Sequence, residues 1–139
     1  MDEKWMEMYK AADAVRQSRR LSEYIEAGGV AAAVAAKSGR IYTGVCVDAA
    51  CSLGICAERN AIFNMITNGE REIERVLALM PDGKAGAPCG ACRELMIQLM
   101  PESFGKIEIL LDCESENIIC MPKEACLLSV SLSSCLLHH

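Results

Sequence analysis

The sequence predicts an α/β fold, with a mixed sheet of about five strands and helices packed on its faces. Segments typical of helices alternate with short apolar segments typical of strands along most of the chain, and such alternation is characteristic of a sheet covered by helices. Only a short polar turn at 37–40 separates the first two strand segments, so they should form a hairpin. The later strands are separated by helical segments, which favours crossover connections and therefore a mixed sheet.

The first predicted element is a helix over residues 3–26, which Gly28-Gly29 would end. Its apolar residues recur close to the helical period, and charged residues occupy the other face. Ser18, which lies in a cluster of arginines, marks the point at which this helix would break. The apolar positions are Trp5, Met8, Ala12, Val15, Leu21 and Ile25.

Two strands and a helix should follow. Residues 30–36 form a continuous run of small apolar residues with the length of a buried strand, and residues 41–47 alternate as a second strand. A loop over 49–55 then leads to a helix over 57–68, which Asn68-Gly69 ends. The residues of this helix that should face inward are Ala61, Ile62, Met65 and Ile66.

The second half of the chain repeats the alternation of strand and helix. Pro101 should stop the helix in this half, and a proline also precedes the last short helix. The predicted elements are a strand over 75–80, a helix over 90–100, strands over 107–111 and 117–121, and a short helix over 124–128.

Composition limits the classes of protein that fit. The 139 residues suit one domain over 1–139, and 52% of them are hydrophobic. No apolar run approaches the roughly 18 residues of a membrane helix, and Met1-Asp2-Glu3-Lys4 has no signal-peptide pattern. The net charge of −5, without a stripe of Lys and Arg, argues against binding to long nucleic acid.

The nine cysteines favour a reducing cytoplasm over a disulfide framework, because their number is odd and some of them have metal-type spacing. The only histidines, His138 and His139, stand at the end of the chain, which argues against a Ser-His-Asp or Cys-His mechanism. Four cysteines lack ligand spacing and should be simple thiols: Cys113, Cys120, Cys126 and Cys135.

Two short motifs, each at the start of a predicted helix, carry the chemistry: Cys56-Ala57-Glu58-Arg59 and Pro88-Cys89-Gly90-Ala91-Cys92-Arg93. Zinc binds thiolates in a tetrahedron, and a catalytic zinc site keeps one position open. Cys56, Cys89 and Cys92 would supply three ligands. Glu58 would lie near the metal without binding it, which suits a carboxylate that transfers protons. Buried core cysteines are the alternative interpretation, but they do not account for Glu58 and Arg59.

This pair of motifs resembles the all-cysteine form of the cytidine deaminase superfamily, in which Cys-x-Glu is followed by Pro-Cys-x-x-Cys. The resemblance covers residues 28–128. The turn over 38–44 and the segment 56–63 are similar to the small free-nucleoside branch, which includes cytidine deaminases and blasticidin-S deaminases. It implies a three-layer α/β/α sandwich, with one Zn2+ per chain at the N-termini of two central helices.

The resemblance also implies a reaction, namely the zinc-dependent hydrolytic deamination of cytidine, deoxycytidine or a close analogue, with release of ammonia. Glu58 would be the catalytic acid and base, and the backbone at Ala57 would hold the amide edge of the substrate. Arg59, in the turn after Cys56, would offset the negative charge of the thiolates by a hydrogen bond to sulfur.

The substrate-binding positions depart from the family pattern. Cytidine deaminases carry an Asn and a Glu, two residues apart, on the strand before the first zinc helix, where they bind the ribose hydroxyls. This sequence has Cys46 and Asp48 at those positions. Asp48 can still accept a sugar hydroxyl, whereas Cys46 is a poor substitute for an amide. No aromatic residue stands near Gly28, where the family has a ring-stacking partner.

The sequence therefore leaves the natural substrate open. A blasticidin-S-type deaminase, or one for another unusual pyrimidine, is the alternative enzyme. A non-catalytic zinc-stabilised binding module is an alternative of a different class, although the intact Glu58 and the open coordination position count against it.

Assembly into a homotetramer is expected from the resemblance, with a dimer as the alternative. The two zinc helices carry apolar residues on more than one face, and a closed assembly would bury the surplus. The tail over 129–139 lacks the Leu-Leu-Pro segment and the aromatic residue of small deaminases, so its contribution to the pocket should be altered. The apolar helix residues are Ile62, Phe63, Met65, Leu95, Met96, Ile97, Leu99 and Met100.

Overall fold

The computed structural model describes residues 1–121 and contains a six-stranded sheet with three α-helices. None of the helices in this part of the chain is long and apolar enough to cross a membrane. The predicted helix over 124–128 and the tail over 129–139 lie outside the described residues. The elements are α1 (Glu3–Val15), β1 (Arg19–Arg20), β2 (Glu26–Ala36), β3 (Ile41–Asp48), α2 (Ala57–Thr67), β4 (Ile73–Leu79), α3 (Gly90–Leu99), a 3-10 turn (Phe104–Lys106), β5 (Glu108–Asp112) and β6 (Asn117–Cys120).

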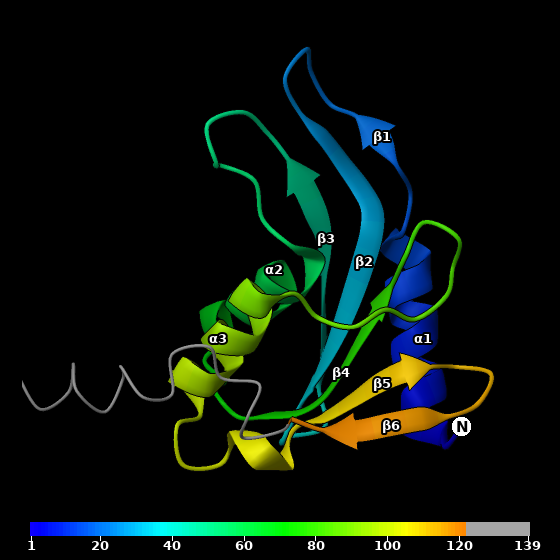
Figure 1. Cartoon of the computed structure of the whole chain (residues 1–139), viewed down its shortest axis with the longest axis vertical. Coiled ribbons are helices and arrows are strands. Elements are labelled where there is room, and N and C mark those ends of the chain that lie inside the picture. The colour runs from blue at the N-terminus through cyan, green and yellow to red at the C-terminus, as the bar shows by residue number, and fades with distance from the viewer. Residues whose placement is uncertain (122–139) are drawn as a thin grey trace, which may run out of the picture.

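The long strand β2 lies in the interior of the sheet and pairs with three strands, β1, β3 and β4 (Figure 1). It pairs antiparallel with β3 at residues 26–27 and 31–35, with a register shift between these two stretches, so β2 and β3 form the predicted hairpin. Both β1 and β4 pair antiparallel with the opposite edge of β2, at its first two residues and at its second half respectively. β5 lies parallel to β4, and β6 closes the order antiparallel to β5. The sheet is therefore mixed, as predicted.

The helices cover both faces of this sheet and give the predicted three-layer α/β/α arrangement. Figure 1 shows α2 and α3 side by side on one face and α1 on the other. Each interface holds its own buried apolar cluster, one around Ile62, Met65 and Met96 and one around Trp5 and Met8. Alternate residues of the strands point into alternate layers, so the sheet contributes side chains to both clusters.

Strand β2 contributes very small side chains to the two layers between the sheet and its helices. Of the residues from 31 to 36, all except Val34 are alanines, and each is at most 1% exposed. Because alanine carries a single methyl group, both layers of helices can lie close to the backbone of β2. The larger side chains of the helices fill the space that remains.

The predicted helix over 3–26 is wrong beyond residue 15. Arg16 has extended backbone angles and ends α1. The chain then turns back as a short hairpin, in which the N–H of Leu21 donates to the carbonyl of Ile25 and the Ser22 hydroxyl accepts the N–H groups of Tyr24 and Ile25. Leu21 is 59% exposed, so its helical spacing did not reflect a buried helix face.

The other differences are small. The sheet has six strands instead of about five because β1 adds a two-residue strand. Ile66 was expected to face inward but is 41% exposed, since it stands on the outer side of α2. On α3, Leu95 and Leu99 pack partly against the core, so this helix presents less apolar surface than the sequence suggested.

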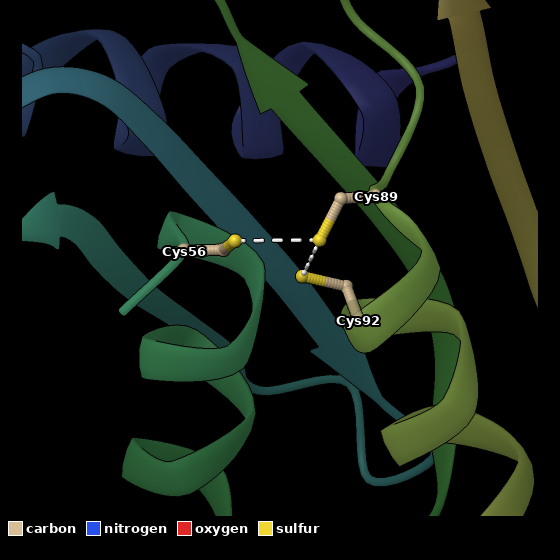
Figure 2. A group of neighbouring side chains, drawn as sticks. All are labelled: Cys56, Cys89 and Cys92. Carbon is tan, nitrogen blue, oxygen red and sulfur yellow. Dashed lines mark hydrogen bonds between the residues drawn. The ribbon is translucent and has the colours of Figure 1, made fainter. Parts of the chain in front are cut away.

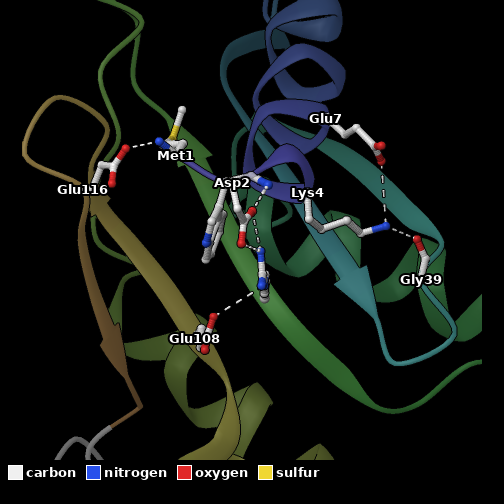
Figure 3. A network of polar contacts seen from close by, with 9 residues as sticks. Met1, Asp2, Lys4, Glu7, Gly39, Glu108 and Glu116 are labelled. Atoms are coloured by element: carbon white, nitrogen blue, oxygen red, sulfur yellow. Dashed lines mark hydrogen bonds and ion pairs between the residues drawn. The ribbon is translucent and has the colours of Figure 1, made fainter.

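A polar network ties the start of α1 to the sheet (Figure 3). Asp2 caps the helix by accepting the backbone N–H of Trp5 at 2.9 Å. Arg75 on β4 donates to both carboxylate oxygens of Asp2 at 2.9 Å, forms an ion pair with Glu108 on β5 at 3.4 Å, and places its guanidinium 5.0 Å from the centre of the Trp5 ring. One cation thus links α1 with two neighbouring strands.

The helix α2 lies directly on β3, and this contact sets the position of the first motif. A Cβ atom at Gly44 would lie 2.3 Å from the backbone nitrogen of Ala61, so only glycine allows this approach. Asn60 and Asn64 donate from their side chains to the backbone carbonyls of Val45 (3.0 Å) and Thr43 (3.2 Å) on β3. These bonds satisfy carbonyl groups on an edge strand that has no further strand beside it in the described sheet.

We predict that Gly44→Ala lowers the free energy of unfolding by about 2–3 kcal/mol, because the new methyl group would overlap the backbone of α2. Chemical denaturation measures this change. Gly29→Ala on β2 is the control, since its Cβ would lie 4.0 Å from its nearest neighbour atom, and its effect should stay within about 1 kcal/mol. Equal stability of Gly44→Ala and the native protein would contradict the close approach.

Candidate metal centre

Three cysteines from two helices converge at one point beside the sheet (Figure 2). Cys56 is the N-cap residue of α2, Cys89 is the N-cap residue of α3, and Cys92 lies in the first turn of α3. The Sγ atoms of Cys56 and Cys89 are 3.3 Å apart, as are those of Cys89 and Cys92. All three sulfurs lie within 4.8 Å of one another. The structure therefore brings together the three residues predicted as metal ligands.

The geometry of this group fits zinc. With Zn–S distances of about 2.3 Å, the ligands of a tetrahedral zinc are separated by about 3.8 Å, which is close to the distances between these sulfurs. Burial of Cys92 and the nearby charges of Glu58, Cys89 and Cys56 raise the pKa of the Cys92 thiol. Ligation requires the thiolate form, and a cation between the sulfurs would reverse this rise in the pKa.

Hydrogen-bond donors contact the other two sulfurs. Burial acts to raise the pKa of the Cys89 thiol, but hydrogen bonds from the backbone N–H of Cys92, from the neighbouring thiols and from the backbone N–H of Ala91 lower it overall. These N–H groups belong to the exposed start of α3, where the helix dipole favours an anion. Arg59 donates from Nη2 to the Sγ of Cys56 at 3.6 Å, which places its charge where the sequence predicted it.

Glu58 is the one buried charged residue among the described residues, with 4% of its surface exposed. It lies in the first turn of α2, two residues after Cys56. Burial raises the pKa of its carboxyl group, while its own backbone N–H, the Cys92 thiol and the charge of Arg59 act to lower it. A carboxyl group held in this way gains and loses a proton closer to neutral pH than a surface glutamate does.

A cavity of about 450 Å³ opens beside the first motif. It shares Cys56 and Arg59 with the metal centre, and the end of β3 and the loop over 49–55 form its other walls. Cys46 and Asp48, which stand where cytidine deaminases carry their ribose-binding Asn and Glu, both line this cavity. Ala57, whose backbone was predicted to hold the substrate, is buried at the first position of α2.

Sequence reasoning missed the residues that position this site. Asn60 and Asn64 attach α2 to β3, and Gly44 allows the helix to approach. The sequence did carry a signal for this contact. Two asparagines four residues apart share one face of a helix, although asparagine is a weak helix former, and such a pair indicates a polar contact on that face. Ser52 and Gly54 also line the cavity, but they belong to an irregular loop without a periodic pattern.

Comparison with known proteins gives a consistent result. Residues 1–104 match the family described as the cytidine and deoxycytidylate deaminase zinc-binding region. A cytidine deaminase of Halalkalibacterium halodurans is 34% identical over 73 residues, which are 52% of this chain and 55% of that protein. A blasticidin-S deaminase of Bacillus cereus is 30% identical over 89 residues, which are 58% of this chain and 64% of that protein. The matched part thus spans about half to two thirds of the length of these curated relatives.

Solved structures match over more of the chain. The crystal structure of cytidine deaminase from Mycobacterium leprae has a TM-score of 0.67 at 28% identity and covers 86% of this chain and 95% of that chain. The cytidine deaminase from Burkholderia pseudomallei has a TM-score of 0.62 at 27% identity, over 87% of this chain and 94% of that chain.

We predict one zinc ion per chain, held by the three thiols. In Cys89→Ser, loss of one thiolate ligand should reduce the zinc content well below one ion per chain, as measured by elemental analysis of protein purified without chelator. Cys51→Ser is the matched control, because Cys51 is an exposed thiol in the loop before the first motif. This variant should retain full zinc content. Full zinc content in Cys89→Ser would remove this cysteine from the ligand set.

Proposed function

Because the chain belongs to the cytidine and deoxycytidylate deaminase family, we propose that it hydrolytically deaminates the cytosine ring of a free nucleoside. The observation that carries this proposal is the buried Glu58 beside three convergent thiols. The substrates would be cytidine, deoxycytidine or a close analogue, and the products the corresponding uracil nucleoside and ammonia.

In this reaction Zn2+ bound by Cys56, Cys89 and Cys92 would supply a Lewis acid that makes water a nucleophile near neutral pH. Glu58 would accept a proton from the attacking water and deliver it to the ring nitrogen. It would then take up the proton of the hydroxyl group that the attack leaves on the ring carbon and deliver it to the departing amine, so that the C–N bond breaks as the carbonyl forms. The raised pKa of its carboxyl group supports these roles, since an efficient proton carrier titrates near the working pH.

The remaining site residues would hold the charge balance and the substrate. Arg59 supports the thiolates through its bond to Cys56, and the backbone of Ala57 would hold the amide edge of the base. Asp48 would accept a sugar hydroxyl within the cavity, and Cys46 would contribute to its wall. Water exclusion around Glu58 follows from its burial, which strengthens the electrostatic interactions of the site.

A blasticidin-S-type deaminase is the second candidate. The similarity to the Bacillus cereus blasticidin-S deaminase supports it, as does the replacement of the expected Asn–Glu pair by Cys46 and Asp48. Following the ultraviolet absorbance of cytidine, deoxycytidine and blasticidin S during incubation with the zinc-loaded protein separates the two candidates.

We also propose a cytoplasmic homotetramer. The seven cysteines of the described chain are all free thiols, which supports a reducing compartment. Phe63 and Ile66 on the outer side of α2 are 43% and 41% exposed, which supports a contact between subunits there.

We predict that Glu58→Gln retains zinc and the fold but loses turnover by about 10²–10⁴-fold, because the amide keeps the shape of the side chain and cannot transfer protons. Steady-state deamination rates together with zinc content and circular dichroism test this. Turnover at the native rate would show that another group carries the protons.

We predict a mass of about four chains in solution, where one chain has a mass of 15.1 kDa. Light scattering at micromolar concentration measures this mass. A monomer would contradict self-association, whereas a dimer would contradict only the tetramer. Phe63→Ser should favour smaller species if α2 forms the contact.

A further inference from the structure

The loop over 80–88, the β4–α3 loop, leads to the second ligand motif and begins as a short hairpin. Directly after β4 the chain turns, and the N–H of Gly83 donates to the carbonyl of Met80 at 2.8 Å. Leu79 and Ala85 then form an antiparallel bridge across this turn. The chain therefore folds back along the end of β4 before it reaches the metal centre.

The returning part of this hairpin is tied to the sheet close to the ligands. The N–H of Gly86 donates to the carbonyl of Ala78 on β4 at 3.0 Å. Two residues, Ala87 and Pro88, follow before Cys89, and this connection spans at most about 10 Å. Proline fixes its own φ angle and also restricts the residue before it. The position of Gly86 is therefore transmitted to Cys89 through a short and stiff connection.

Arg16, the residue that ends α1, holds the turn of this hairpin from the outside. Its Nη1 donates to the backbone carbonyl of Pro81 at 2.9 Å. Figure 1 shows the β4–α3 loop beside the end of α1, from where it runs across to α3. A Cβ atom at Gly83, whose φ is +82°, would lie 3.3 Å from Nη2 of Arg16. The guanidinium thus lies directly against the turn.

Asp13, in the last turn of α1, keeps the guanidinium in this orientation. Its Oδ1 accepts from Nη2 of Arg16 at 2.8 Å and from Nε at 3.2 Å. Because the carboxylate occupies this edge of the planar group, Nη1 remains available for the loop. The Asp13 side chain is 44% exposed, and exposed ion pairs contribute little to global stability. Removing this contact should therefore leave the protein folded.

The neighbouring arginines have other contacts. Arg19 donates to the carbonyl of Gln17, two residues before it, and Arg20 contacts acidic and backbone groups of its own hairpin. Among the three arginines of this segment, Arg16 is thus the one for which the described structure records a hydrogen bond to the β4–α3 loop. Arg19 consequently provides a matched position at which the same charge can be removed.

We propose that Arg16 is a positioning residue of the metal centre, which holds the β4–α3 loop so that the thiols of α3 stay aligned with Cys56. The Sγ atoms of Cys56 and Cys89 belong to different helices and are 3.3 Å apart, so the site depends on how accurately the start of α3 is held. The proposal rests on the zinc site of the proposed function. It does not depend on which nucleoside is the substrate.

The experiment measures how fast the folded protein releases its metal. Zinc-loaded native protein and four variants, Arg16→Met, Arg16→Lys, Asp13→Asn and Arg19→Met, are mixed with an excess of a chromogenic zinc chelator. Methionine retains an unbranched side chain without a donor, whereas lysine retains a charge and a donor for the carbonyl. The same proteins loaded with Co2+ are compared by visible absorption, which reports the geometry of a thiolate site, and by urea denaturation.

Removing groups that support metal ligands typically lowers metal affinity by about 10- to 100-fold. Because Arg16 acts through a loop, we expect Arg16→Met to release zinc about tenfold faster than native protein, with an altered cobalt spectrum and a nearly native urea midpoint. Arg16→Lys should recover most of the native rate, and Arg19→Met should match native protein. Asp13→Asn, which retains Arg16, should release zinc at an intermediate rate, and it tests the contact even where Arg16→Met folds poorly.

Two results would overturn the positioning role. One is a native release rate and a native cobalt spectrum in both Arg16→Met and Asp13→Asn. The other is faster release that Arg16→Lys does not correct and that follows the loss of global stability, because Arg16 would then be a structural residue only. A native protein that retains neither zinc nor cobalt would instead overturn the metal site, and with it the proposed function.

Discussion

The contact between β3 and α2 is the constraint on which the rest of the site depends. Gly44 has no side chain, so the backbone of α2 lies against the backbone of β3, and Asn60 and Asn64 hold it there. Cys56 caps this helix and Glu58 stands in its first turn. A shift of α2 by the width of a methyl group would separate Cys56 from Cys89, since their sulfurs are only 3.3 Å apart. The ligand geometry is thus determined by backbone packing, several residues away from the thiols.

The site also concentrates negative charge in a small volume. Burial raises the pKa of both Glu58 and Cys92, because the ionised form of each side chain would be an anion held away from water. Backbone N–H groups at the start of α3 help to lower the pKa of the Cys89 thiol, and the guanidinium of Arg59 donates to the Sγ of Cys56. These two groups reduce the negative charge without cancelling it, and a bound divalent cation would complete the balance. Asp48 adds a carboxylate to the wall of the cavity beside the first motif.

The sequence predicted the grouping of the three thiols better than it predicted the extent of the first helix. The ligand motifs are local, because the spacing of Cys56 and Glu58 on one turn, and of Cys89 and Cys92 on another, already determines which side chains share a helix end. The helix over 3–26 failed since Leu21 and Ile25 have helical spacing although they stand in an exposed hairpin. That outcome depends on pairing with β2, which is a tertiary contact and leaves no periodic trace. The walls of the cavity were missed for the same reason, since loop residues such as Ser52 are placed by the chain around them.

The alanines of β2 have a consequence for how this protein can change over time. Ala31, Ala32, Ala33, Ala35 and Ala36 have helices or strands packed closely around them. Any larger side chain there would press on α1 or on α2, and through α2 on the thiols. We therefore expect amino-acid substitutions during evolution to be rare in β2 and more frequent in the loop over 49–55, where new side chains would meet solvent or substrate. A scaffold built in this way can acquire new substrates while its interior stays the same.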